Sequence, residues 1–279
     1  MPTHEEKTRR FRALHEDSGA FIIPNVWDGG SAALMADLGF AALATSSSAA
    51  AATLGKLDGG LTRAEALGHA RQIAELSPLP VAADLENGFG HEPAVVAETV
   101  RLAVQAGLVG ASIEDASGDA AHPIYEFEHA CARVKAAVEA ARAAPVPFVL
   151  TARAENFLHG HADLEDTVRR LQAFERAGAD VLFAPCLPDL AAVRTVCAAL
   201  KRPVNFMVGV PGASFSRAEL AAAGVKRISL STTLYRAAMT GLLSAARQAQ
   251  QGSFDYVETL LGGKDLGRAL KAQAQGRSS

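Results

Sequence analysis

The chain has 279 residues, 49% of them hydrophobic, and a formal net charge of −3 at pH 7. This composition indicates a folded protein with a sizeable core, and the lack of any apolar run of about eighteen residues argues against a membrane span. Lysine and arginine are scattered rather than clustered, so we expect neither nucleic acid nor a membrane as a partner.

From residue 21 onward, a short segment of β-forming residues repeatedly precedes a loop and a few turns of helix. The predicted strands are residues 21–26, 42–46, 81–85, 111–115, 148–153, 181–185, 204–208 and 227–231. The predicted helices are residues 30–38, 62–76, 93–107, 126–144, 164–178, 190–200, 217–224 and 234–250. Thr62 and Glu65 have the spacing of a capping box, and Pro93 suits a first helical turn.

Eight strand–helix units in series predict an α/β fold of the (β/α)₈ TIM-barrel type, formed by a single domain over residues 1–279. The structural alternative is a doubly wound open sheet, but no Gly-x-Gly-x-x-Gly motif follows the first strand. Residues 252–279 are expected to form a short extension that holds a helix over residues 256–261 and a tail bearing lysine and arginine.

The three cysteines, Cys131, Cys186 and Cys197, form no Cys-x-x-Cys pair, which argues against a disulfide framework. The charged N-terminus is followed by no apolar stretch of the signal-peptide type. These features predict reduced thiols and a soluble, cytoplasmic protein.

The strand predicted at residues 81–85 ends in an acidic pair, Asp84 and Glu86, followed by a glycine-rich turn. A spacing of two residues places both carboxylates on one face of a strand, where it passes into a loop. Mg²⁺ is usually held by one or two carboxylates together with water and substrate oxygens. The pair is therefore a candidate floor for a divalent metal, although an Asp-x-Glu after a strand can also serve only the turn.

Other polar residues gather where the predicted strands end, which in a TIM barrel is the catalytic face. They are Asn25, Trp27 and Asp28; Thr45, Ser46, Ser47 and Ser48, with Asp58 after them; Glu114 and Asp115; Arg153 and Glu155; and Asn205. Such a set suits an anion and a metal together, because Arg153 can bind a carboxylate with two hydrogen bonds. Asp115 and Asn87 are interpreted as loop or capping residues, and Asp28 is left open between the two roles.

Several motifs together resemble the isocitrate lyase/phosphoenolpyruvate mutase superfamily. They are Asn25-Val-Trp-Asp28-Gly-Gly-Ser, the 45–48 run with Leu54-Gly-Lys-Leu-Asp58, Asp84-Leu-Glu86-Asn-Gly-Phe-Gly, Ile113-Glu114-Asp115, and Ala152-Arg153-Ala-Glu155. The likeness runs collinearly over about residues 18–250 and is specific as a set. It is greatest to the branch of oxaloacetate decarboxylases and carboxyphosphonoenolpyruvate phosphonomutases.

The resemblance implies a barrel whose last helix, residues 234–250, is exchanged between subunits of a homodimer or homotetramer. It further implies Mg²⁺, with Mn²⁺ as a substitute, bound chiefly through Asp84, with Glu86 and Glu114 holding metal-bound water. Arg153 would bind the carboxylate of a small α-oxo acid, and Asp58 would stand near the reacting centre. The substrate pocket would be lined by Thr45, Ser46, Ser47, Ser48, Asn205 and Tyr235.

The loop after the fourth strand departs from the family pattern and narrows the expected chemistry. Lyases of the family carry Lys-[Lys/Arg]-Cys-Gly-His there, whereas residues 116–123 contain no thiol, and Ala44 replaces a tryptophan found in phosphonate-transferring members. The resemblance therefore implies Mg²⁺-dependent decarboxylation of oxaloacetate or a similar acid through an enolate. Three further functions stay open. The first is a lyase of the 2-methylisocitrate or dimethylmalate type, in which Tyr235, His122 or Glu155 would transfer the proton. The other two are a phosphonomutase-like enzyme and a non-catalytic carboxylate-binding barrel.

Overall fold

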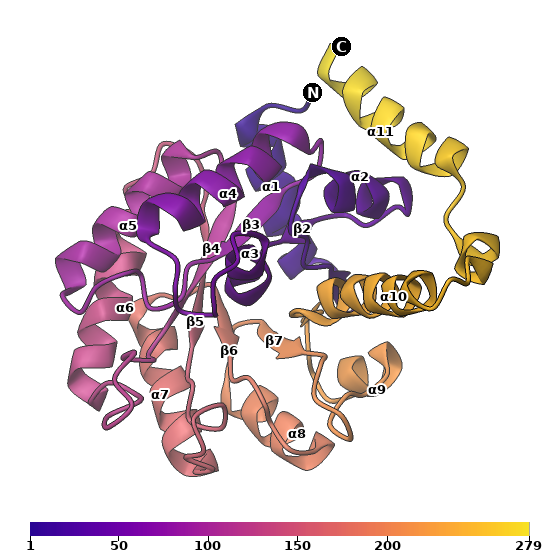
Figure 1. Cartoon of the computed structure of the whole chain (residues 1–279). Coiled ribbons are helices and arrows are strands. Elements are labelled where there is room, and N and C mark those ends of the chain that lie inside the picture. The colour runs from indigo at the N-terminus through magenta and orange to yellow at the C-terminus, as the bar shows by residue number, and fades with distance from the viewer. Residues whose placement is uncertain (279) are drawn as a thin grey trace.

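The computed structural model describes residues 1–278, in which eight parallel strands form one sheet (Figure 1). The strands are β1 (Phe21–Ile23), β2 (Leu43–Ala44), β3 (Val81–Asp84), β4 (Gly110–Glu114), β5 (Val149–Arg153), β6 (Val181–Phe183), β7 (Val204–Met207) and β8 (Arg227–Ser229). Their order in space is β1-β8-β7-β6-β5-β4-β3-β2. A parallel bridge between Asn25 and Ala44 joins the two ends of this order and closes the barrel. The predicted (β/α)₈ architecture is confirmed.

Most of the helices lie around the outside of the strands (Figure 1). The helices of the structure have the following bounds. They are α1 (His4–Glu16), α2 (Gly29–Asp37), α3 (Ser47–Thr53), α4 (Arg63–Leu76), α5 (Pro93–Gln105), α6 (Phe127–Arg142), α7 (Leu164–Ala177), α8 (Leu190–Ala199), α9 (Arg217–Ala222), α10 (Thr233–Gln250) and α11 (Gly263–Ser278). The capping box of Thr62 and Glu65 and the position of Pro93 at the start of α5 are confirmed. None of the helices in residues 1–278 is both long and apolar enough to cross a bilayer.

Three helices were not expected from the sequence. Helix α3 occupies residues predicted as a loop; it begins at Ser46, whose hydroxyl caps the amide of Ala49, and consists largely of alanine, the strongest helix former. Helix α1 begins with a capping box formed by Thr3 and Glu6. Helix α11 forms where a tail was predicted, and the helix predicted at residues 256–261 is instead a 3₁₀ helix, η1 (Asp255–Thr259).

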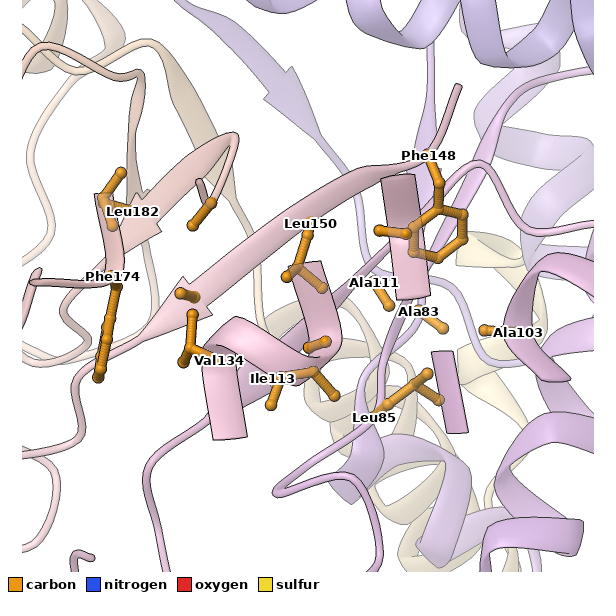
Figure 2. Close-up of a cluster of buried hydrophobic side chains, with 14 of the residues drawn as sticks. Ala83, Leu85, Ala103, Ala111, Ile113, Val134, Phe148, Leu150, Phe174 and Leu182 are labelled. Carbon is orange, nitrogen blue, oxygen red and sulfur yellow. The ribbon is translucent and has the colours of Figure 1, made fainter. Parts of the chain in front are cut away.

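Alternation along the strands decides which side chains face the helices and which face the barrel interior. Figure 2 shows side chains on the helix-facing side, where Ala83 and Leu85 follow one another two residues apart, as do Ala111 and Ile113. Their neighbours in sequence therefore point inward. The inward set includes Asp84, Ser112, Glu114, Thr151 and Arg153, so the same strands that build the hydrophobic core also carry polar groups into the barrel.

Helix α10 lies apart from the core, whereas α11 packs back onto the molecule. Helix α10 contains no buried residue in this chain, and Leu242 and Leu243 on it are exposed. Helix α11 returns to pack against α2, where Arg268 pairs with Asp37 at 3.3 Å (Figure 1). Exchange of α10 between subunits stays a prediction.

Candidate active site

A cavity of about 230 Å³ opens among the carboxyl ends of the strands and extends into the barrel. Its mouth is lined by Thr45, Ser46, Ser47, Ser48, Asp58, Asp84, Arg153, Ser231 and Thr232, and its deeper part by Ser112, Thr151, Asn205, Arg227 and Ser229. Of the residues predicted for substrate binding, the structure brings together Thr45, the three serines, Arg153 and Asn205. Tyr235 is outside the lining and packs edge-on against Trp27, with ring centroids 5.4 Å apart.

Arg153 at the end of β5 joins three carboxylates. Its Nη1 lies 3.0 Å from Asp84 Oδ1 and 3.2 Å from Glu114 Oε2, and its Nε donates to Glu155 Oε1 at 2.7 Å. Burial alone would lower the pKa of Arg153, but Glu155, Glu114 and Asp84 hold it well above its ordinary value. Arg153 is therefore a permanent cation, and two of its three nitrogens are used to hold acidic side chains.

Asp84, at the end of β3, is fixed by neighbours on both sides. Its Oδ2 accepts the backbone N–H of Ser47 at 3.3 Å and its Oδ1 accepts the hydroxyl of Ser112 at 3.2 Å. Its own amide donates to Thr45 Oγ1 at 3.1 Å. These contacts tie Asp84 to the start of α3 and to β4, so the carboxylate stands between the serine run and Arg153.

Glu86 follows Asp84 in a left-handed backbone conformation, with φ of 49°. Its Oε1 is buried without a hydrogen-bond partner in the part of the chain that the structure describes. Burial raises the pKa of Glu86 to about 7, and the Asp84 and Asp58 carboxylates contribute to the rise. A buried carboxylate oxygen that accepts no hydrogen bond and lies near another carboxylate favours a positively charged partner.

Burial also raises the pKa of Glu114, and partial desolvation raises the pKa of Asp58, which is exposed at the mouth of the cavity. For Glu114 the charge of Arg153 opposes that rise, while Glu155 and Asp84 add to it. For Asp58 a hydrogen bond with the Ser47 side chain opposes the rise, and the nearby Asp84 adds to it. Asp58 and Asp84 line the cavity, whereas Glu86 and Glu114 lie outside its lining, and together these acidic groups outnumber the one guanidinium of Arg153.

The acidic groups fit a hard divalent cation such as Mg²⁺, because carboxylate oxygens are its preferred protein ligands. Within residues 1–278 no three His, Cys, Asp or Glu side chains form a ready-made metal cage. Mg²⁺ is commonly held by one or two carboxylates with water completing its shell, so such a cage is not required. The unpartnered Oε1 of Glu86, two residues from Asp84, is the observation that best fits a bound cation.

The deeper cavity contains a guanidinium that the sequence analysis did not single out. Arg227, at the start of β8, is 7% exposed and donates to Asn205 Oδ1 at 2.8 Å and to Thr151 Oγ1 at 2.9 Å. Burial lowers its pKa to about 9. It makes no ion pair within residues 1–278, and its position facing inward on a predicted strand was the signal that could have revealed it.

The remaining predicted residues have structural roles or lie away from the cavity. Asp28 caps α2 through the amide of Ser31, Asn87 accepts the amide of Phe89, and Asp115 pairs with Arg170 at 3.1 Å. His159 and His161 are exposed, as predicted. His122 is on the loop after β4, where its exposed ring pairs with Asp119. Glu155 is fully buried, and its Oε2 has no partner within the described residues.

Comparison with known proteins gives one family match that covers most of the chain. The family described as Phosphoenolpyruvate phosphomutase matches residues 11–250. An oxaloacetate decarboxylase of Paraburkholderia xenovorans is 31% identical over 253 residues, which cover 88% of this chain and 83% of that protein.

Two crystal structures have similar folds. A protein of Burkholderia cenocepacia, described as a candidate lyase or mutase, is 48% identical, with a TM-score of 0.93 and 95% of each chain covered. A 2,3-dimethylmalate lyase, a member of the PEP mutase/isocitrate lyase superfamily, is 25% identical, with a TM-score of 0.86 and the whole of both chains covered. These findings agree with the resemblance found in the sequence.

Proposed function

Because the chain belongs to the phosphoenolpyruvate phosphomutase family, we propose that it is a Mg²⁺-dependent carbon–carbon lyase that decarboxylates oxaloacetate or a close relative. Relatives of the chain include lyases and mutases. The observation that carries the proposal is Arg153, which holds Asp84 and Glu114 at the mouth of a cavity rimmed by the serine run. Arg153 and Asp84 face the same small space, and Glu114 contacts Arg153 beside it.

The residues of the mouth would bind and orient the substrate. Two nitrogens of Arg153 contact carboxylates of the protein, which leaves Nη2 to bind a substrate carboxylate. The hydroxyls of Ser46, Ser47 and Ser48 line the same cavity and can hold further substrate oxygens. Asp84 would hold Mg²⁺, with Glu86 and Glu114 bonded to its water. When bound, Mg²⁺ would supply the positive charge that stabilises an enolate.

Asp58 is proposed as the group that protonates the enolate. It lines the cavity, and partial desolvation together with the nearby Asp84 carboxylate raises its pKa, so it keeps a proton at higher pH than an ordinary aspartate does. Loss of CO₂ requires no strong base, which agrees with a loop after β4 that contains no thiol. The C4 carboxylate would leave toward that loop.

Lysis of a dimethylmalate-like acid is the second candidate reaction, favoured by the 2,3-dimethylmalate lyase whose structure covers the whole chain. That reaction needs a group to manage the proton of a leaving carbonyl compound. Glu155 lies beside Arg153 with one oxygen unpartnered within the described residues, whereas the His122 ring is exposed. A phosphonomutase-like enzyme and a non-catalytic carboxylate-binding barrel are the third and fourth candidates, and neither would form pyruvate from oxaloacetate.

The deciding experiment measures pyruvate formed from oxaloacetate by the purified protein with Mg²⁺. We expect turnover above the background of free Mg²⁺, and we expect Asp84→Ala to abolish it together with Mg²⁺ binding in calorimetry with oxalate present. Arg142→Met is the matched control, because Arg142 pairs with Asp180 on the outer surface, away from the cavity.

Two outcomes would contradict the decarboxylase, and a third would contradict the proposed metal site. Cleavage of substituted malates without oxaloacetate turnover would establish the dimethylmalate-type lyase. Binding of Mg²⁺ and oxalate without turnover of any α-oxo or 2-hydroxy diacid would establish the binding barrel. An Asp84→Ala variant that binds Mg²⁺ as tightly as the parent would place the metal elsewhere.

A further inference from the structure

The loop that begins at Glu86 contains two residues in an unfavourable backbone conformation. Both Glu86 and Phe89 are non-glycine residues in the left-handed region, with φ of 49° and 62°. Residues with a Cβ avoid this region because the side chain approaches the following carbonyl oxygen. Such a loop persists only where surrounding groups hold it, so the contacts around residues 86–91 decide where the Glu86 carboxylate stands.

Arg133 of α6 stabilises this loop through hydrogen bonds to its backbone. Its side chain is only 1% exposed, and its Nη1 donates to the carbonyl of Gly90 at 2.6 Å. Nη1 also donates to the carbonyl of His91, and Nη2 donates to that of Asn87. One planar guanidinium thus binds three carbonyl oxygens of a five-residue segment, whereas a lysine carries its three donors on one nitrogen and cannot span the same three oxygens with a planar fork.

Within the described residues, the hydrogen bonds of Arg133 go to this loop, and its guanidinium also lies over one aromatic ring. Within residues 1–278 it makes no ion pair with an acidic side chain, and its Cζ lies 4.2 Å from the ring centroid of Tyr125. A buried arginine without an acidic partner is costly, so its retention needs a reason other than charge pairing. Binding the loop carbonyls provides that reason.

Tyr125 connects the same loop to the end of β4. Its hydroxyl lies 2.6 Å from His91 Nδ1, and its backbone N–H donates to the carbonyl of Asp115 at 2.8 Å. Glu114, adjacent to Asp115, donates its own backbone N–H to the carbonyl of Glu86 at 3.0 Å. Arg133 and Tyr125 therefore hold two acidic strand ends, those of β3 and β4, in one fixed arrangement.

We propose that Arg133 is a positioning residue for the metal site, which sets the Glu86 carboxylate relative to Asp84 and Glu114 by fixing loop 87–91. The inference rests on the proposed function in that it takes these carboxylates as the site of the cation. Arg133 itself touches neither the cavity nor the substrate. Its effect is exerted wholly through the backbone of the loop.

The test measures the affinity for Mn²⁺ by electron paramagnetic resonance, and hydrogen exchange of residues 86–91 in the metal-free protein. For Arg133→Lys we expect Mn²⁺ binding weaker by about 10- to 100-fold, the usual effect of losing a group that orients metal ligands, and faster exchange in the loop. Addition of guanidinium to Arg133→Gly should recover part of the Mn²⁺ affinity.

Arg142→Lys is the matched control. Arg142 lies on the same helix and also donates to a loop carbonyl, that of Gly178 at 2.9 Å, but it is remote from the acidic residues. We expect parent-like Mn²⁺ affinity from this variant. A folded Arg133→Lys protein with parent-like affinity and exchange would overturn the inference.

Tyr125→Phe provides a milder second variant, because it removes only the hydroxyl contact to His91. We expect a smaller loss of Mn²⁺ affinity, of about two- to fivefold, as a single hydrogen bond to the loop is lost. Should Arg133→Lys fail to fold, unchanged affinity and exchange in Tyr125→Phe would overturn the inference. A parent protein that binds no Mn²⁺ would overturn the proposed metal site, and loop exchange would then alone decide whether Arg133 fixes residues 87–91.

Discussion

Arg153 and Arg227 are both buried arginines that line the same cavity, and their surroundings differ in charge. Arg153, at the mouth, contacts the carboxylates of Asp84, Glu114 and Glu155. Arg227, deeper in the barrel, contacts the neutral oxygens of Asn205 and Thr151. Its Nη1 lies 3.4 Å from His15 Nε2, and burial lowers the pKa of His15 to about 3, so that ring is neutral as well.

The difference shows two ways in which this barrel accommodates a buried, positively charged arginine. Around Arg153, acidic side chains outnumber the one guanidinium, and the pKa values of both Arg153 and Glu114 are raised. In the deeper cavity, oriented neutral acceptors replace an ion pair, and the pKa of Arg227 is lowered. The cavity is therefore acidic where a metal would bind and positive beneath it, which favours an anionic ligand held against a cation.

The largest expected effect is that of Arg153→Met, which leaves three carboxylates without their guanidinium. We expect turnover to fall by about 10³-fold or more, on the scale of losing a preorganised charge contact. The free energy of unfolding at pH 7 should fall by about 3–5 kcal/mol, as when one partner of a buried pair is removed. Urea unfolding at pH 7 and pH 5 measures this change, and the loss should be smaller at pH 5, where the acids take up protons. A loss no greater than that of Arg227→Met would contradict the comparison.

A pH titration tests the protonation of the acidic residues near Arg153. The pKa of Glu86 is raised to about 7 in the folded protein from an ordinary value of 4.5, because burial disfavours its charged form. Its contribution to the stability of the metal-free protein is therefore present below pH 4.5 and is lost as pH rises from 4.5 through about 7. Binding of Mg²⁺ should release a proton below pH 7, so the apparent affinity should rise by about tenfold per pH unit up to that pH.

Calorimetry in buffers of different ionisation enthalpy measures the released proton directly. Glu86→Gln is the control, since its amide cannot titrate, and it should show a flatter dependence of Mg²⁺ affinity on pH. A parent protein whose Mg²⁺ affinity is constant between pH 5 and pH 7 would show that no carboxyl of raised pKa takes part in metal binding.

The smallest expected effect is that of Arg227→Met, an apolar replacement of similar length. It removes hydrogen bonds to Asn205 and Thr151 but also removes a buried charge that has no acidic partner within residues 1–278. We expect the free energy of unfolding to change by about 1–2 kcal/mol, equally at pH 5 and pH 7, because no carboxylate is left unpaired. Turnover should fall by about tenfold or less, through the loss of the donor that orients Asn205. Loss of all activity would show that Arg227 acts on the substrate itself.

The strand ends were predictable from the sequence. For this reason, most residues that line the mouth of the cavity were among those predicted. Asp84 and Arg153 end apolar segments, and a parallel barrel brings such ends together at one face. The geometry of the (β/α)₈ fold thus made their proximity a consequence of strand order. Their contact at 3.0 Å bears out that reasoning for position, while their roles in metal and substrate binding stay predictions.

The rest of the site depends on contacts that no local pattern encodes. Arg227 begins β8, away from the strand ends where catalytic residues are expected, and its inward direction brings it to the cavity. Arg133 lies mid-helix, and its bond to Gly90 links residues 43 positions apart in sequence. Tyr235 was expected in the pocket by family likeness, but the chain turns after β8 so that its ring packs on Trp27 instead.

The closure of the barrel between β1 and β2 has a consequence for how the molecule fluctuates. Only one bridge, between Asn25 and Ala44, joins these strands within the described residues, and Asn25 supplements it with side-chain bonds to Thr45 O at 2.7 Å and from Leu230 N at 2.9 Å. This seam holds fewer backbone bonds than the five-residue pairing of β4 and β5. Local opening of a protein begins where the fewest cooperative bonds must break. The barrel should therefore open locally first at this seam, which adjoins the serine run of the cavity, so local opening would change the spacing of the residues that line the mouth.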